Sequence, residues 1–117
     1  MPTKDYYFEQ IANEFAMGRE AERIGNMGMA RVCARRAAGQ AIGWFLTKHS
    51  RPTWGSHFMR GLNGLKDDNA FPQEARDAAV RLTTHITDQF KYPFSSDPLA
   101  DAQIIIDAIK QLMGASE

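Results

Sequence analysis

Apolar residues recur every three to four positions over most of this chain, which is the spacing of one face of an α-helix. The longest such stretch is Asn26–His49, which is rich in alanine and nearly free of helix-breaking residues. Its main apolar stripe consists of Ala30, Ala34, Ala37, Ala38, Ala41, Ile42 and Phe45. A second strip, to one side of the first, consists of Val32, Gly39, Gly43 and Leu46. A helix that is apolar on two sides is central in a bundle or lies at a subunit interface, and its two glycines indicate that another backbone approaches closely.

The preceding segment predicts an amphipathic helix that begins after Thr3 and runs to about Ile24. Thr3 is the predicted N-cap, because its hydroxyl can accept a hydrogen bond from a free backbone N–H of the first turn. Gly25 is predicted to end this helix in a left-handed conformation, and Asn26 to cap the next one.

Three more helices are predicted further along the chain. Ser56 is the expected cap of a short helix, and Pro72 the first residue of a longer one whose apolar stripe ends at Phe90. Asp97 is the expected cap of the last helix, which carries isoleucines at helical spacing. No segment alternates as a strand does. The sequence therefore predicts one all-α domain over residues 1–117, an up-and-down bundle of four longer helices and one short helix.

The composition is that of an ordinary globular domain, with 44% hydrophobic and 24% charged residues. Cys33 is the only cysteine, which indicates a reducing compartment. The first residues do not resemble a signal peptide, and no apolar run approaches the ~20 residues that span a bilayer. We therefore expect a cytoplasmic protein that does not bind a membrane.

Charge is distributed unevenly although the net charge is zero. From Arg19 to Arg60 there are eight basic residues and two acidic ones, whereas from Asp67 onward there are nine acidic residues and four basic ones. Such asymmetry can mark a face that binds polyanions. The alternative, which we favour, is that the two halves neutralise each other when they pack together.

Three short motifs resemble the HEPN-domain family (higher eukaryotes and prokaryotes nucleotide-binding). The first is the turn Gly25–Asn26 followed by a helix with paired alanines, ARVCARRAAGQAI. The second is His57 at the start of a short helix that contains leucines, and the third is the aromatic–proline turn Phe90–Pro93 before the last helix. Order and spacing agree over about residues 5–113.

The resemblance implies a helical bundle that commonly forms a homodimer, and a function in RNA cleavage, nucleotide or RNA binding, or partner binding. Many ribonucleases of the family are toxins with an antitoxin partner, and they use an arginine and a histidine four to six residues apart without a metal. Arg51 and His57 have five residues between them. They lie before the short helix, however, and not at the start of a late helix as in those ribonucleases, and Lys91 stands where arginine is usual.

Arg51 and His57 are accordingly the candidate catalytic residues. His57 could transfer the proton, because the ordinary pKa of histidine is close to neutral, and Arg51 could hold the phosphate through two hydrogen bonds. The alternative, which we favour, is that His57 caps or packs the start of the short helix and that Arg51 is solvated.

The candidate nucleotide- or RNA-binding residues are Arg31, Arg35, Arg36, Lys91 and Tyr92. The alternative for the three arginines is ion pairing with Glu20 and Glu22 or with a second subunit. The histidines do not have the spacing of metal ligands, and we expect no metal and no cofactor. His85 is expected to form a surface network with Arg81 and Asp88.

The sequence leaves three classes of function open. The favoured class is a non-catalytic module that binds a nucleotide, RNA or a partner protein. The second is a metal-independent ribonuclease of a toxin–antitoxin pair, and the third is a structural protein-interaction dimer.

Overall fold

The computed structural model describes residues 2–55, 57–85 and 93–116, except for the side chains of residues 115 and 116. All the regular secondary structure in these residues is helical. The elements are α1 (Lys4–Arg23), α2 (Met27–Phe45), the 3-10 helix η1 (Pro52–Trp54), α3 (Phe58–Leu65), α4 (Gln73–Thr83) and α5 (Pro98–Ser116). No strand occurs in these residues, so the all-α prediction is confirmed.

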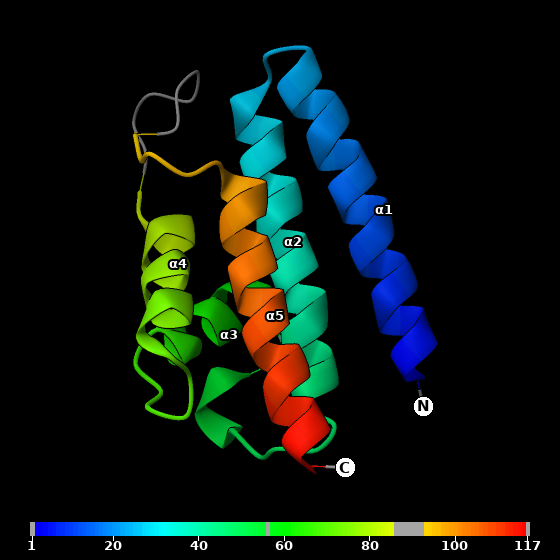
Figure 1. Cartoon of the computed structure of the whole chain (residues 1–117), viewed down its shortest axis with the longest axis vertical. Helices are drawn as coiled ribbons and strands as arrows, with labels where there is room; N and C mark the ends of the chain where they lie inside the picture. Colours follow the sequence, from blue (N-terminus) through cyan, green and yellow to red (C-terminus); the bar gives the residue numbers. More distant parts are fainter. Residues whose placement is uncertain (1, 56, 86–92, 117) are drawn as a thin grey trace.

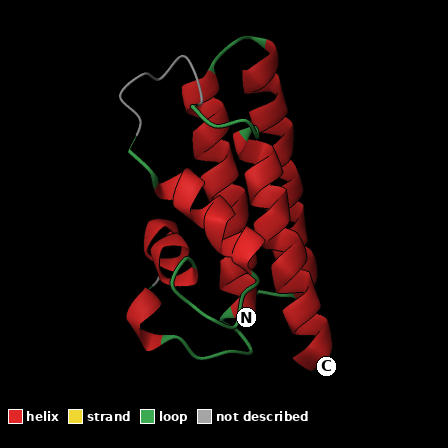
Figure 2. Ribbon diagram, turned by 60° about the vertical axis from the view of Figure 1, so that its left-hand side comes forward, coloured by secondary structure: helices red, strands yellow, loops and turns green. Residues whose placement is uncertain are grey.

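α2 lies in the middle of the bundle (Figure 1). It packs against α1 on one side and against α5 on another, and α3 lies between α2 and α4. α1 and α4 run in one direction while α2 and α5 run in the opposite direction (Figure 1). The long helices are thus arranged up and down. The turned view of Figure 2 shows that the described segments between the helices are loops and that none is a strand.

The helix ends that depend on nearby residues follow the predictions. Thr3 accepts a hydrogen bond from the N–H of Tyr6 at 3.3 Å, and Asn26 accepts one from the N–H of Met29 at 3.0 Å. Gly25 has a φ of 80°, the left-handed conformation that ends α1. Asp97 caps α5 in the same way as Asn26 caps α2, by accepting a hydrogen bond from the backbone N–H three residues later, at 2.8 Å.

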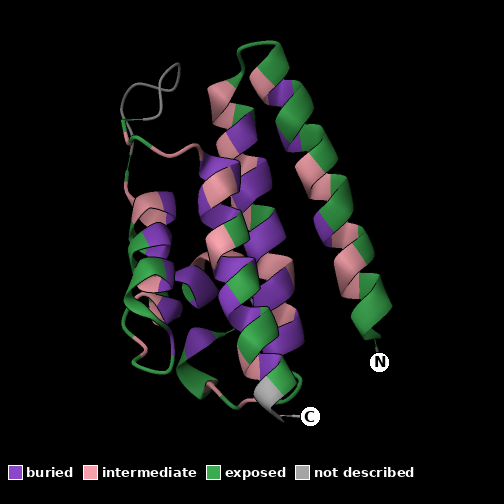
Figure 3. Cartoon of the chain, in the orientation of Figure 1, coloured by how far each residue is buried: buried purple, intermediate pink, exposed green. Residues whose placement is uncertain are grey.

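The core is built on the alanine stripe of α2, because small side chains let neighbouring helices approach closely (Figure 3). A Cβ atom added at Gly39 would lie 2.4 Å from the Cβ atom of Phe58 and 3.5 Å from its Cα atom. The close approach that the glycines predict is therefore confirmed at Gly39, where the start of α3 packs on α2. At Gly43 the neighbour is the ring of Tyr7 and not a backbone.

Two predicted helices are shorter than expected. α2 ends at Phe45 and continues as a turn to Lys48, whereas the sequence suggested a helix to His49. α4 ends at Thr83, because Thr84 has an extended conformation with a ψ of 134°. The apolar stripe predicted to run to Phe90 therefore does not form one continuous helix, and its last members, Ile86 and Phe90, lie outside the described residues.

Local competition for backbone groups accounts for the early end of α4. The hydroxyl of Thr83 donates to the carbonyl of Ala79 at 2.8 Å, and that of Thr84 donates to the carbonyl of Val80 at 2.6 Å. Such side-chain bonds, together with the β-branched shape of threonine, weaken a helix at its end. At the other end, Pro72 is the N-cap and not the first helical residue.

No helix among the described residues has both the length and the apolar character needed to cross a membrane.

Candidate functional site

Arg51, the candidate phosphate ligand, is held at the corner between α2 and η1. Its Nε donates to Oδ2 of Asp68 at 2.6 Å, and its Nη1 donates to the carbonyl of Ser50 at 2.8 Å. The guanidinium carbon lies 5.4 Å from the ring centre of Phe45 and 5.8 Å from that of Trp54, and both rings are buried. Arg51 is thus partly buried, and it joins the end of α2, the 3-10 helix η1 and the turn after α3. The expectation that it is merely solvated is wrong.

The ion pair with Arg51 lowers the pKa of the Asp68 carboxyl. Burial by itself would raise the pKa of the Asp68 carboxyl. The hydrogen bond from Arg51, the backbone N–H of Ala70 and the charges of Arg51 and Arg76 outweigh that effect, and the pKa is below its ordinary value. The ionised carboxylate is therefore the form that the fold stabilises.

His57, the candidate proton-transfer group, is the N-cap of α3. Its Nδ1 accepts a hydrogen bond from the N–H of Met59 at 3.2 Å, and its ring stacks on Phe58 with 4.4 Å between ring centres. Capping by His57 is the favoured alternative of the sequence analysis and is confirmed. The cap predicted at Ser56 is replaced by His57, and Ser56 itself lies outside the described residues.

No hydrogen bond, ion pair or ring contact joins Arg51 and His57 among the described residues. Each side chain is bound to its own segment, Arg51 to Asp68 and His57 to the first turn of α3. The five-residue spacing is thus accounted for by two separate structural roles.

Arg31 and Arg35, the first two candidate polyanion ligands, bind the end of α4. Nη2 of Arg31 donates to the carbonyls of Leu82, at 3.3 Å, and of Thr84. Nε of Arg35 donates to the carbonyl of Leu82 at 2.8 Å. The last carbonyls of a helix lack partners within the helix and carry its negative end, so two cations are favourable there.

Arg36, the third candidate, turns toward α1 and has a distance of 3.9 Å from Nη1 to Oε1 of Glu14. Glu20 and Glu22, the partners predicted for these three arginines, pair with arginines of α1 instead. Glu20 accepts from Nε of Arg23 at 2.8 Å, and Glu22 accepts from Nη1 of Arg19 at 2.7 Å. The remaining two candidates, Lys91 and Tyr92, lie outside the described residues.

A buried carboxylate that the sequence analysis did not single out lies at the start of α5. Asp101 is fully buried, and its Oδ1 accepts from Nε and Nη2 of Arg81 at 3.0 and 2.8 Å and from the hydroxyl of Ser96 at 2.9 Å. Arg81 thus pairs with Asp101. His85, the histidine of the predicted surface network, is exposed, and Asp88 lies outside the described residues, so that network stays a prediction. The only signal in the sequence was an acid in the first turn of an apolar helix.

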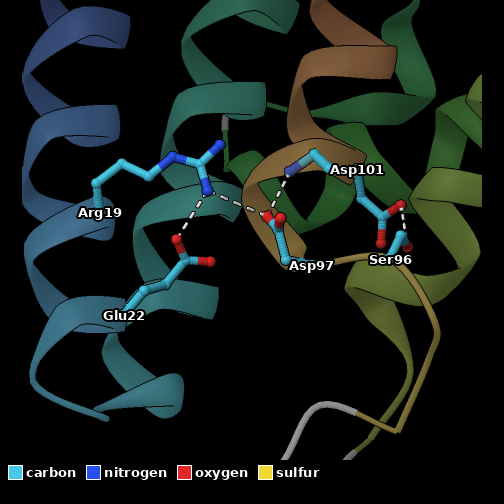
Figure 4. A network of polar contacts seen from close by, with 6 residues as sticks. Arg19, Glu22, Ser96, Asp97 and Asp101 are labelled. Carbon is cyan, nitrogen blue, oxygen red and sulfur yellow. Dashed lines mark hydrogen bonds and ion pairs between the residues drawn. The ribbon is translucent and has the colours of Figure 1, made fainter.

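Next to Asp101, Asp97 connects α5 to α1 (Figure 4). Nη1 of Arg19 bonds to Glu22 and lies 3.5 Å from Oδ1 of Asp97. The pairs Arg19–Asp97 and Arg51–Asp68 both join the basic first half to the acidic second half. The expectation that the halves neutralise each other on packing is confirmed at these pairs.

The described residues offer neither a cluster of metal ligands nor an activated thiol. Among the described residues, no three histidine, cysteine, aspartate or glutamate side chains lie together as a metal site. Cys33 is buried, and burial raises the pKa of its thiol; the charge of Glu14 adds to this effect and that of Arg36 opposes it. A buried thiol with a raised pKa is a poor nucleophile.

Most of the large exposed apolar side chains lie on α1 and at the start of α2. On α1, Met17 exposes 50% of its surface and Ile24, the C-cap, exposes 62%; Tyr6 on α1 and Met29 on α2 are also exposed. Few residues of this 20-residue helix are buried: Ile11, Gly18 and Ala21. Figure 3 shows the resulting contrast between α1, largely exposed or half-buried, and the mostly buried face of α2.

Comparison of the chain with family models, with curated proteins and with solved structures gives no match.

Proposed function

We propose that this chain is a non-catalytic helical module that binds another protein chain through the outer face of α1. The observation that carries this proposal is that α1 is apolar on two sides. Its inner side, with Ile11, packs on α2, while Tyr6, Met17 and Ile24 remain exposed on a neighbouring side of the helix. A helix that is apolar on two sides is usually covered on both in the working assembly.

The other classes have weaker support. Arg31 and Arg35, the best candidates for binding a nucleotide or RNA, are bonded to carbonyls at the end of α4. Arg51 and His57, the candidate catalytic pair, make separate structural contacts. The HEPN resemblance remains the reason to consider a ribonuclease or a toxin with an antitoxin partner, and the homodimer that it implies is one form of protein binding.

The test of binding uses Met17→Glu, with Val80→Glu as its matched control. Both side chains are exposed to a similar degree, 50% and 47%, and Val80 lies on α4, away from the proposed face. Substitutions of exposed residues change stability little, about ±0.5 kcal/mol, so both variants fold. With immobilised protein and an extract of the source cells, we expect proteins retained by the parent and by Val80→Glu to be lost with Met17→Glu.

The test against catalysis is incubation of the purified parent with RNA in the presence of a chelator, beside Arg51→Ala and His57→Ala. We expect no cleavage by any of the three. Cleavage by the parent that both substitutions abolish without unfolding the protein would replace our proposal with the ribonuclease.

A further inference from the structure

We infer that the partner covering the outer face of α1 is a basic amphipathic helix of another protein, with its apolar side chains on the exposed line of α1 and a lysine or arginine against Glu9. This inference rests on the proposed function, since it names the chemistry of the partner of the same face. It is carried by two properties of that face, the spacing of its exposed side chains and the charges at its edges.

The exposed side chains of this face have the spacing of a seam between two helices. Tyr6, Asn13, Met17 and Ile24 are exposed and follow one another at intervals of seven, four and seven residues. These are intervals between the a and d positions of a heptad repeat, through which two helices pack along their length. The line spans about 27 Å of helix. A helix is therefore the element that fits this face.

A carboxylate without a counter-charge lies at one edge of this seam. Glu9 is exposed and lies about 60° around α1 from Tyr6, at a position that flanks the line. No ion pair or hydrogen bond joins its side chain to another described residue. Asp5, one turn earlier, is exposed as well, and two like charges at this spacing disfavour each other. A cation from outside the chain would relieve this repulsion.

The cations of α1 are engaged elsewhere. Nζ of Lys4 lies on the side of α2, 5.6 Å from the ring centre of Phe8 and 5.7 Å from that of Trp44. Arg19 and Arg23 are each bonded to a glutamate three residues away within α1. Charges that flank a seam select the partner helix, because they lie opposite its own flanking residues. The carboxylate at this edge therefore favours a cationic helix and repels an anionic one.

The other edge of the seam already has its counter-charge. Glu14 flanks the line on the side of α2, where it is half-buried, and its Oε1 lies 3.9 Å from Nη1 of Arg36. The partner is thus asymmetric, with its selecting cation at the edge of its apolar stripe that faces Glu9.

Two synthetic peptides serve as probes. Both are as long as α1, 20 residues, with leucine at the seam positions and either lysine or glutamate at all flanking positions. The flanking charges within each peptide are alike, so its copies repel one another. Because one helix face is small beside a standard interface, we expect a Kd for the lysine peptide on the order of 10 to 100 μM. The glutamate peptide should bind about 10-fold more weakly at low salt, as measured by fluorescence anisotropy.

Glu9→Lys tests the charge, with Asp67→Lys as its matched control. Both acids are exposed, and Asp67 lies in the turn after α3, a described helix that α1 does not contact. Glu9→Lys should weaken the lysine peptide about 10-fold and strengthen the glutamate peptide by a similar factor, whereas Asp67→Lys should change either Kd less than about twofold. Glu9→Lys also places an opposite charge one turn from Asp5, so the helix keeps its stability, and circular dichroism checks this.

Three results would overturn the basic partner. They are a lysine peptide that does not bind the parent, equal affinity of the parent for the two peptides, and a preference for lysine that Glu9→Lys leaves unchanged. Met17→Glu should weaken both peptides, because the new carboxylate would be buried in the middle of the seam; a Kd that it leaves unchanged places the peptides elsewhere and also overturns the inference.

The retention of cell proteins separates this inference from the proposed function. Proteins that are lost with Met17→Glu, while the peptides show no preference for lysine, overturn the basic partner and leave the proposed function intact. Retention that does not depend on Met17 overturns both.

Discussion

Gly39→Ala should destabilise this protein even though alanine is the better helix former. Gly39 lies in the middle of α2, where its missing side chain makes room for the start of α3. A Cβ atom at this position would lie 2.4 Å from the Cβ atom of Phe58, far inside normal contact. Neither Cβ can rotate away, because each is fixed to its backbone, so α3 must shift.

The magnitude follows from two opposing terms. Replacing glycine by alanine inside a helix gains up to about 1 kcal/mol of helix propensity. Overpacking a contact that cannot relax costs about 1 to 3 kcal/mol, and the severity of this contact puts Gly39 at the upper end. We therefore expect a net loss of about 1 to 2 kcal/mol, which corresponds to a fall in Tm of about 4 to 8 °C for a chain of this size.

Two other helical glycines provide the controls. Gly43→Ala places its Cβ 3.2 Å from a ring carbon of Tyr7, a half-buried side chain that can move, so the change should be within about 0.5 kcal/mol. Gly114→Ala meets nothing within 4 Å and should stabilise α5 by about 0.5 kcal/mol. Urea unfolding and thermal melts of the three variants give the order directly. A Gly39→Ala variant as stable as Gly114→Ala would refute the close packing of α3 on α2.

Two further predictions concern buried and half-buried carboxylates. Asp101→Asn removes the charge that binds Arg81 and should cost about 2 to 4 kcal/mol in urea unfolding, whereas Asp107→Asn, at an exposed site, should cost less than about 0.5 kcal/mol; equal effects would contradict the buried pair. Because the folded pKa of Asp68 is below its unfolded value of about 3.9, its contribution is present above that pH and is lost as the pH falls through the folded pKa. The stability difference between the parent and Arg51→Met should therefore shrink below about pH 4, and a difference independent of pH would show that Arg51 acts only through packing.

The parts of the fold that depend on neighbouring residues could be predicted from the sequence. The caps at Thr3, Asn26 and Asp97 each bond to a backbone N–H three residues later, so a local pattern contains both partners. Gly25 ends α1 for an equally local reason, because its left-handed φ suits glycine. The helical stripes depend only on spacing along the chain, and they predicted every α-helix found in the described residues.

The candidate site was harder to predict, because its contacts join residues far apart in the sequence. Arg31 and Arg35 bind carbonyls about 50 positions later, and backbone carbonyls leave no signal in the sequence. Arg51 bonds to Asp68, which lies 17 positions later in the sequence, after η1 and α3. The sequence identifies such arginines as cations on a helix or in a loop, and only the fold decides whether a phosphate or the protein itself accepts their hydrogen bonds.

That decision has an energetic consequence for any nucleotide or RNA ligand. A phosphate that took over the bonded nitrogens, Nη2 of Arg31 and Nε of Arg35, would displace the carbonyls of Leu82 and Thr84. Each partly buried carbonyl left without a donor costs about 1 to 3 kcal/mol, which is comparable to the gain from one charge-assisted hydrogen bond. The net free energy of phosphate binding at this place would therefore be close to zero, and binding would also weaken the contacts that hold the end of α4. The outer face of α1 has no such cost, because Met17 and Ile24 are already exposed and lose only water when a partner covers them.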